Sequence, residues 1–134
     1  MFVDASAIVA ILTREPEAGA LVDRLEAAER AITSPIAVVE ATVGLCRKRH
    51  ASIEEARKHV GDLLSAARIA LVAVTAEDAE AALDAFARYG KGRGHPAQLN
   101  LGDCFAYAVA KNQRRSLLFK GDDFAKTDID GAVE

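Results

Sequence analysis

The sequence predicts an α/β fold: a three-layer sandwich with a central, mostly parallel sheet of about five strands. Two observations support this. Short apolar runs alternate with longer helix-like segments along the chain, and a content of 28 alanines favours helices between the strands. The length of 134 residues suits one domain, which we expect to span residues 1–134. In such sheets the functional crevice lies beyond the carboxyl ends of the strands.

The sequence of the first half of the chain predicts two strands and three helices. A short buried strand over residues 2–4 is followed by a short helix over residues 5–12. Pro16 suits the first turn of a second helix, which we expect over residues 17–30. After a brief strand at residues 31–33, Ser34-Pro35 provides an N-cap and a first-turn proline for a helix that runs to about His50.

The second half continues the alternation. Ser52 and Glu55 have the spacing of a capping box and begin another helix, and Thr75 caps a helix that we expect to run through residue 87. The other elements expected are a strand at 69–74, a loop at 90–96, a helix from Asn100 to about 112, a strand at 117–119, a turn at 121–124 and a last edge strand marked by Ile129.

Composition excludes several classes of protein. The net charge of −3 argues against a general polyanion binder. Cys46 and Cys104 are too few for a disulfide scaffold and lack the spacing of a zinc site, so we expect buried thiols in a reducing cytoplasm. The chain has no apolar run long enough to span a bilayer and no basic segment before its apolar opening, so we expect neither a membrane span nor a secretory signal.

Four acidic positions are difficult to explain as ordinary surface charge. Asp4 directly follows the first strand, Asp103 opens a very apolar helix, and the adjacent pair Asp122 and Asp123, counted here as one position, follows the strand at 117–119. Each of these has an alternative explanation as a helix cap or a turn residue. Glu40 interrupts an apolar helix, where a lone ionised carboxylate costs several kcal/mol unless it is paired or bound to a cation.

Together these acids indicate a metal site. A parallel sheet brings residues at its strand ends to one edge, and clustered carboxylates repel one another unless a divalent cation lies among them. Oxygen-only ligands select Mg²⁺ or Mn²⁺ rather than Zn²⁺, and His50, His59 and His95 lack zinc-like spacing. Such a site suits phosphodiester hydrolysis by a water that the metal acidifies. Ser6 is placed either to orient that water or Asp4, or simply as a hydroxyl at a helix N-terminus.

Two basic clusters accompany the acids. Residues 47–50 read RKRH and end a predicted helix, where positive charge suits the helix dipole and usually faces solvent. The second cluster is Arg88, Lys91, Arg93 and His95, which taken alone also suits a solvated helix end. If the acids form a nuclease site, Arg88, Lys91 and Arg93 are well placed to hold a nucleic-acid backbone, because they come shortly before Asp103 in sequence.

Four stretches of the chain resemble one family: MFVDASAIVAIL, the S-P-x-x-x-x-E helix ending in Glu40, RYGKGRGHPAQLNLGDCFAYAVAK and LLFKGDDFAKTDI. They resemble the PIN-domain ribonucleases, and more narrowly the VapC toxins of toxin–antitoxin pairs. The resemblance implies a PIN-like sandwich and a Mg²⁺- or Mn²⁺-dependent endoribonuclease that cuts RNA, often tRNA or rRNA. It also implies a homodimer and a VapB-type antitoxin that inserts a segment into the acidic cleft.

The family's site residues carry over onto Asp4, Ser6, Glu40 and Asp103, and the fourth acid onto Asp122 or Asp123. We favour Asp122, because it comes first after the glycine. Asp4 and Asp103 are then the principal metal ligands, and Glu40 and Asp122 complete the set.

Two other functions remain open on the residues alone. One is another metal-dependent phosphoesterase or a DNA nuclease, although the serine of Asp4-Ala5-Ser6 argues against an aspartyl-nucleophile phosphatase, which normally shows D-x-D. The other is a non-catalytic docking module whose acids bind a basic partner. Helices rich in alanine and leucine, at 36–46 and 53–67, are candidates for a dimer interface or simply for the internal core.

Overall fold

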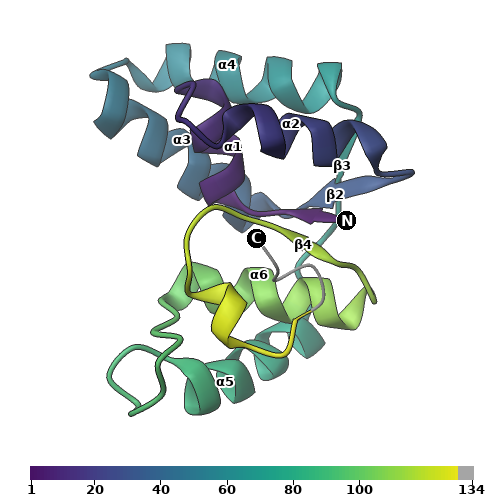
Figure 1. The fold of residues 1–134 in the computed structure, drawn as a ribbon, viewed down its shortest axis with the longest axis vertical. Coiled ribbons are helices and arrows are strands. Elements are labelled where there is room, and N and C mark those ends of the chain that lie inside the picture. The colour runs from purple at the N-terminus through teal and green to yellow at the C-terminus, as the bar shows by residue number, and fades with distance from the viewer. Residues whose placement is uncertain (130–134) are drawn as a thin grey trace.

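The structure, a computed structural model, describes residues 1–129 and contains a four-stranded parallel sheet (Figure 1). The strand order is β3-β2-β1-β4, and every neighbouring pair is parallel. The strands are β1 (Phe2–Val3), β2 (Ala31–Thr33), β3 (Ile69–Leu71) and β4 (Leu117–Leu118). Because all strands point the same way, their carboxyl ends meet at one edge, as the sequence predicted.

Helices cover both faces of the sheet, which confirms the predicted three-layer sandwich. In Figure 1, α1 to α4 lie on one side of the strands, and α5 and α6 lie on the other. The helices are α1 (Ala5–Leu12), α2 (Ala18–Ala27), α3 (Pro35–Arg49), α4 (Ile53–Ala66), α5 (Ala76–Tyr89) and α6 (Leu101–Asn112), with a short 3₁₀ helix at Phe124–Lys126.

Adjacent strand residues belong to different cores. Phe2 and Leu117 pack with α5 and α6, whereas Val3 and Leu118 pack with α1 and its neighbours. All four side chains have no measurable exposure. Since successive side chains of a strand point to opposite faces, a strand that is apolar at every position requires helices on both sides.

The helix starts follow the capping residues of the sequence. Ser34 accepts a hydrogen bond from the backbone N–H of Ala37, and Ser52 and Glu55 form the predicted capping box. Thr75 caps α5, and Asn100 caps α6 in a box that includes Asp103. The same carboxylate that we predicted as a metal ligand therefore also stabilises the start of α6.

Some expected boundaries were too long. The strand expected at residues 69–74 ends at Leu71, although the Val72 N–H still donates to the Thr33 carbonyl at 2.9 Å. The helix expected at 17–30 spans Ala18–Ala27, and residues 28–30 only lead into β2. Such ends depend on which ladder, cap and turn contacts the terminal residues make, including contacts with distant parts of the chain.

The expected edge strand at Ile129 was wrong. Ile129 is not in a strand; its N–H donates to the Thr127 hydroxyl at 3.2 Å, and its side chain is buried against the α5–α6 core. Within residues 1–129 the sheet therefore has four strands instead of about five. Any part of that expected strand beyond Ile129 lies outside the described residues.

Two smaller expectations concern cysteines and membranes. Both cysteines are free; Cys104 is buried as expected, whereas Cys46 is only partly buried. Among residues 1–129, no helix has the length and apolar character that crossing a membrane requires.

Candidate active site

A cavity of about 320 Å³ opens where the strands β1 and β4 end and the first turn of α6 begins. We call Asp4, Glu40 and Asp103 its acidic end, and Lys48 and Lys120 its lysine pair. The cavity therefore brings together three of the acids predicted from sequence, which are far apart along the chain.

Asp4 is the most buried of these acids, with 3% of its surface exposed. Its backbone N–H donates to the Leu118 carbonyl at 2.9 Å, so the parallel pairing of β1 with β4 fixes its position. Its Oδ2 accepts hydrogen bonds from the Ser6 N–H at 3.0 Å and from the Ser6 hydroxyl at 2.6 Å. Burial raises the pKa of Asp4, and the Ser6 hydrogen bonds oppose that rise.

Ser6 also connects two segments of the site. Its hydroxyl oxygen accepts a hydrogen bond from the Lys120 N–H at 3.0 Å while its proton is directed to Asp4. The serine therefore holds the Asp4 carboxylate and the backbone after β4 in one arrangement. The predicted role of Ser6 in orienting the first carboxylate stays a prediction, and these hydrogen bonds support it.

Asp103 occupies the third position of α6. Its Oδ2 accepts the Asn100 N–H at 3.0 Å, which completes the capping box. Burial raises the pKa of Asp103 to about 6, the Asn100 hydrogen bond lowers it, and the negative charges of Asp4 and Asp123 raise it further. A carboxylate that caps a helix yet has a raised pKa lies in an environment short of positive charge.

Glu40 reaches the same cavity from the middle of α3. Burial raises the pKa of Glu40 to about 7, with further contributions from the charges of Asp4 and Asp103. Its carboxylate lies directly against Gly102, where an added Cβ would be 1.8 Å from Glu40 Oε2. A glycine in the first turn of α6 thus provides the space that the Glu40 carboxylate occupies.

The turn after β4 carries the two candidates for a fourth acid. Asp122 and Asp123 are both exposed and follow Gly121, whose φ of +104° is a conformation suited to glycine. Asp123 is the one whose charge raises the pKa of Asp103. This interaction connects Asp123 to the acidic end.

The donor set fits a hard divalent cation. The acidic end presents carboxylate oxygens only, and the mutual repulsion of Asp4, Glu40 and Asp103 leaves negative charge that a cation would neutralise. Among residues 1–129, no three acidic, histidine or cysteine side chains are already arranged as a closed set of metal ligands. The chemistry of the ligands therefore fits Mg²⁺ or Mn²⁺, while binding requires these side chains to rearrange.

The predicted RNA-binding residues lie outside this cavity. Arg88 pairs with Asp128 at 3.8 Å and lies 4.7 Å from the centre of the Tyr89 ring. Arg93 lies 6.0 Å from the Phe86 ring centre, and Lys91 is exposed. These three cations belong to the end of α5 and the following loop.

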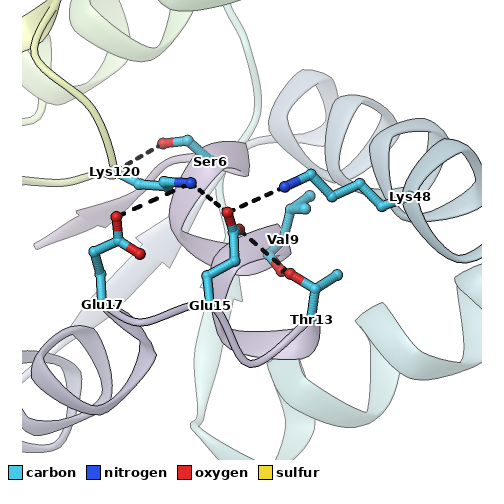
Figure 2. A network of polar contacts seen from close by, with 7 residues as sticks. All are labelled: Ser6, Val9, Thr13, Glu15, Glu17, Lys48 and Lys120. Atoms are coloured by element: carbon cyan, nitrogen blue, oxygen red, sulfur yellow. Dashed lines mark hydrogen bonds and ion pairs between the residues drawn. The ribbon is translucent and has the colours of Figure 1, made fainter.

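The sequence reasoning missed the two lysines, Lys48 and Lys120, that do line the cavity. Figure 2 shows both lysines with their shared partner Glu15. Lys48 Nζ donates to Glu15 Oε1 at 3.1 Å, and Lys120 Nζ contacts the same oxygen. Lys48 was visible in the basic cluster at 47–50, which we interpreted as a solvated helix end. Pairing it with residues 15 and 120 requires long-range information that spacing along the chain does not contain.

Comparison with known proteins agrees with this fold. The model of the family described as PIN domain matches residues 1–130. A VapC ribonuclease of Rhizobium meliloti is 44% identical, with 96% of this chain and 98% of the relative covered. Ribonuclease VapC28 of Mycobacterium tuberculosis is 39% identical over 100% of this chain and 98% of its own length. The crystal structure of M. tuberculosis VapC20, titled a Sarcin-Ricin loop cleaving toxin, superposes with a TM-score of 0.74 at 18% identity, covering 96% of this chain and 95% of that chain.

The fold and the cavity define an α/β protein that has a carboxylate-lined cavity at the carboxyl ends of its strands. The chain belongs to the PIN-domain family, and its curated relatives are VapC ribonucleases. The predicted family is thereby confirmed from matches that cover nearly the whole chain.

Proposed function

We propose that this protein is a metal-dependent endoribonuclease toxin of a toxin–antitoxin pair, acting in the cytoplasm on RNA such as tRNA or rRNA. The observation that carries the proposal is the acidic end: three carboxylates share one cavity, and two of them have pKa values raised to about 7 and about 6. Its VapC ribonuclease relatives provide the reaction class.

The chain's residues take separate roles in this proposal. Asp4 and Asp103 are the principal ligands of Mg²⁺ or Mn²⁺, and Glu40 completes the acidic set. When bound, the cation supplies an acidified water and neutralises charge that develops on the phosphate. Ser6 positions Asp4 through its two hydrogen bonds.

The fourth acid is a choice between neighbours. The sequence favoured Asp122, because it comes first after Gly121. The influence of Asp123 on the pKa of Asp103 supports Asp123 instead. We therefore assign the fourth acidic role to Asp123, with Asp122 as the neighbour to be compared by mutation.

The contacts that we propose with RNA and with protein partners include residues outside the cavity. Arg88, Lys91 and Arg93 are proposed contacts for RNA at the end of α5 and in the loop after it. A VapB-type antitoxin is the proposed inhibitor, and a homodimer is the proposed form of the free protein. The VapC names of the relatives support the antitoxin.

The experiment is cleavage of total bacterial RNA by the purified, antitoxin-free protein, in Mg²⁺ or Mn²⁺ and in EDTA. We expect discrete fragments only with metal, and at least about a 100-fold loss of rate in Asp4→Asn. Asp62→Asn is the matched control, because Asp62 is an exposed aspartate on α4 that pairs with Lys58 at 2.8 Å. Cleavage by Asp4→Asn at the rate of the control, or no cleavage by the folded wild type, would contradict the proposal.

A further inference from the structure

The lysine pair is the feature of the cavity that the proposed acid chemistry does not use. Lys48 comes from the last turn of α3 and Lys120 from the segment after β4, yet both contact Glu15 Oε1 (Figure 2). Glu17 lies 4.0 Å from Lys120, and the second oxygen of Glu15 accepts a hydrogen bond from Thr13 at 3.3 Å. Two ammonium groups therefore share essentially one carboxylate.

The ammonium groups remain accessible from the cavity. The side chains of Lys48 and Lys120 are 50% and 34% exposed, whereas Glu15 is only 15% exposed. Three donors on each ammonium exceed what one carboxylate oxygen can accept. The pair thus has unused donors on its open side, next to the acids.

RNA is negatively charged, so lysines such as Lys48 and Lys120 are needed to attract it into a cavity whose charged residues are mainly carboxylates. The four carboxylates that line the cavity outnumber the two lysines, so a polyanion meets net negative charge there before a divalent cation binds. Phosphate contacts from lysine supply the affinity and fix the register of a nucleic acid. Lys48 and Lys120 are the two cations that line this cavity in the described part of the chain.

We propose that Lys48 and Lys120 form a phosphate subsite, which binds a backbone phosphate of the RNA next to the phosphodiester that is cut. This inference rests on the proposed ribonuclease function and adds a substrate contact to it. The incoming phosphate shares or replaces Glu15 as the acceptor for the two ammonium groups. Glu15 keeps both side chains extended toward the cavity before RNA binds.

The subsite is held at a fixed position relative to the acids. The Lys120 N–H donates to the Ser6 hydroxyl, and that hydroxyl donates to Asp4 Oδ2. A backbone contact of Lys120 thus links the segment after β4 to Asp4 through the Ser6 side chain. Because the lysines and the acids line one cavity, a phosphate bound by the lysines lies in the same cavity as the acidic end.

A purely structural role is the competing explanation. Glu15, Lys48 and Lys120 join the α1–α2 connection, α3 and the segment after β4, so the ion pairs would also serve as a clamp. A clamp affects the free energy of unfolding, whereas a phosphate subsite affects RNA affinity and its dependence on salt. The two roles are separated by measuring both quantities on the same variants.

The test measures binding of fluorescently labelled bacterial tRNA in EDTA, using proteins that carry Asp4→Asn to prevent cleavage. Lys48→Gln and Lys120→Gln are each compared with Lys58→Gln, an exposed lysine of α4 that pairs with Asp62 and undergoes the same loss of charge. Anisotropy gives the Kd at several salt concentrations, and thermal unfolding is followed in parallel. Lys48→Arg and Lys120→Arg restore the charge.

We expect each glutamine variant of the pair to raise the Kd about 10-fold and to reduce the slope of log K against log salt by about 0.7 to 0.9. The arginine variants return most of the affinity, and Lys58→Gln changes neither quantity. In the cleaving wild-type background, the same substitutions raise KM more than they lower kcat.

Several results would overturn the subsite. One is that Lys48→Gln and Lys120→Gln have the same Kd values and salt slopes as Lys58→Gln. Another is that they lower the Tm but leave RNA binding unchanged, which would identify a structural clamp. Failure of the proposed function is a separate outcome, because it appears as absence of metal-dependent cleavage in the protein with wild-type Asp4. Cleavage by that protein, with no effect from either lysine, rejects the subsite alone.

Discussion

Glu40 and Glu15 line the same cavity, yet their environments act in opposite directions. Burial and the charges of Asp4 and Asp103 raise the pKa of Glu40 to about 7. Hydrogen bonds from Lys120, and then Lys48, lower the pKa of Glu15 against the effect of burial. One carboxylate lies among like charges, and the other lies between two cations.

This contrast separates a cluster of carboxylates that repel one another from a carboxylate that is paired with cations of the chain itself. The acidic end lowers the stability of the free protein, because its charges repel in a partly desolvated place. The Glu15 carboxylate, by contrast, is neutralised by two lysines of the chain itself. An uncompensated group of charges held in place by the fold is the expected property of a site that is completed by a ligand.

Gly102→Ala is expected to displace the Glu40 carboxylate from the acidic end without removing a charge. The new Cβ would lie 1.8 Å from Glu40 Oε2, so the flexible Glu40 side chain must move away. We expect RNA cleavage to fall about 100-fold, because displacing a reacting or binding group by about 1 Å has that effect. A cleavage assay on purified Gly102→Ala measures it.

Stability provides the control for this substitution. Alanine is favoured over glycine inside a helix by up to about 1 kcal/mol, so the free energy of unfolding is expected to change by no more than about that amount. Gly61→Ala is the matched variant, since Gly61 lies in α4 and an added Cβ there contacts nothing within 4 Å. Equal activity of the two variants would show that Glu40 has no positional role.

Glu15→Gln tests the other carboxylate of the comparison, the one that is paired with two lysines. The substitution removes the acceptor charge shared by Lys48 and Lys120 while keeping the side chain's size. We expect the free energy of unfolding to decrease by about 1–2 kcal/mol at neutral pH, measured by urea denaturation. Because the folded-state pKa of Glu15 is lowered, this contribution is present above its unfolded pKa of 4.5 and is lost as the pH falls through the folded value. A loss that persists unchanged at low pH would contradict the ion-pair explanation.

Glu40→Gln should have the reverse effect in metal-free protein. The pKa of Glu40 rises from an ordinary 4.5 to about 7, so the folded state binds the proton more tightly and stability falls as the pH increases between these values. Allowing for solvent screening of this half-buried group, glutamine should stabilise the protein by about 1 kcal/mol at pH 8 and by much less at pH 4.5. Thermal unfolding in EDTA at both pH values measures the difference, and a destabilised variant at pH 8 would contradict the prediction.

Lys58→Gln is expected to change the free energy of unfolding least among these variants. Lys58 and Asp62 form an exposed pair at 2.8 Å on α4, with 74% and 64% of their side chains exposed. Such pairs contribute less than about 0.5 kcal/mol, so we expect a barely measurable change in the free energy of unfolding. A loss as large as that from Glu15→Gln would mean that exposure does not distinguish the two ion pairs.

Local chemistry made much of the fold predictable. Ser34 with Pro35, and Ser52 with Glu55, determine helix starts through contacts within three residues, and the structure confirms them. The end of β3 at Leu71 and the position of Ile129 depend on long-range pairing and on a side-chain acceptor, Thr127. Such competition is not visible in hydropathy alone.

The acidic end was predictable because acids in apolar surroundings are conspicuous in a sequence. Asp4 and Glu40 interrupt runs of small apolar residues, and a parallel sheet explains how they meet. Lys48 gave no such signal, since a cation in the last turn of a helix is ordinary. Its partner Glu15 lies 33 residues away, and only the packing of α1 against α3 brings them together.

The most direct test of the account is a calorimetric titration of Mn²⁺ into metal-free wild-type protein and into Asp4→Asn at pH 7.5. If the acidic end is completed by a divalent cation, the wild type binds Mn²⁺ saturably and Asp4→Asn shows at least about a 10-fold weaker affinity. Identical binding by both proteins, or no binding by a folded wild type, would contradict the central claim that these carboxylates form a metal site.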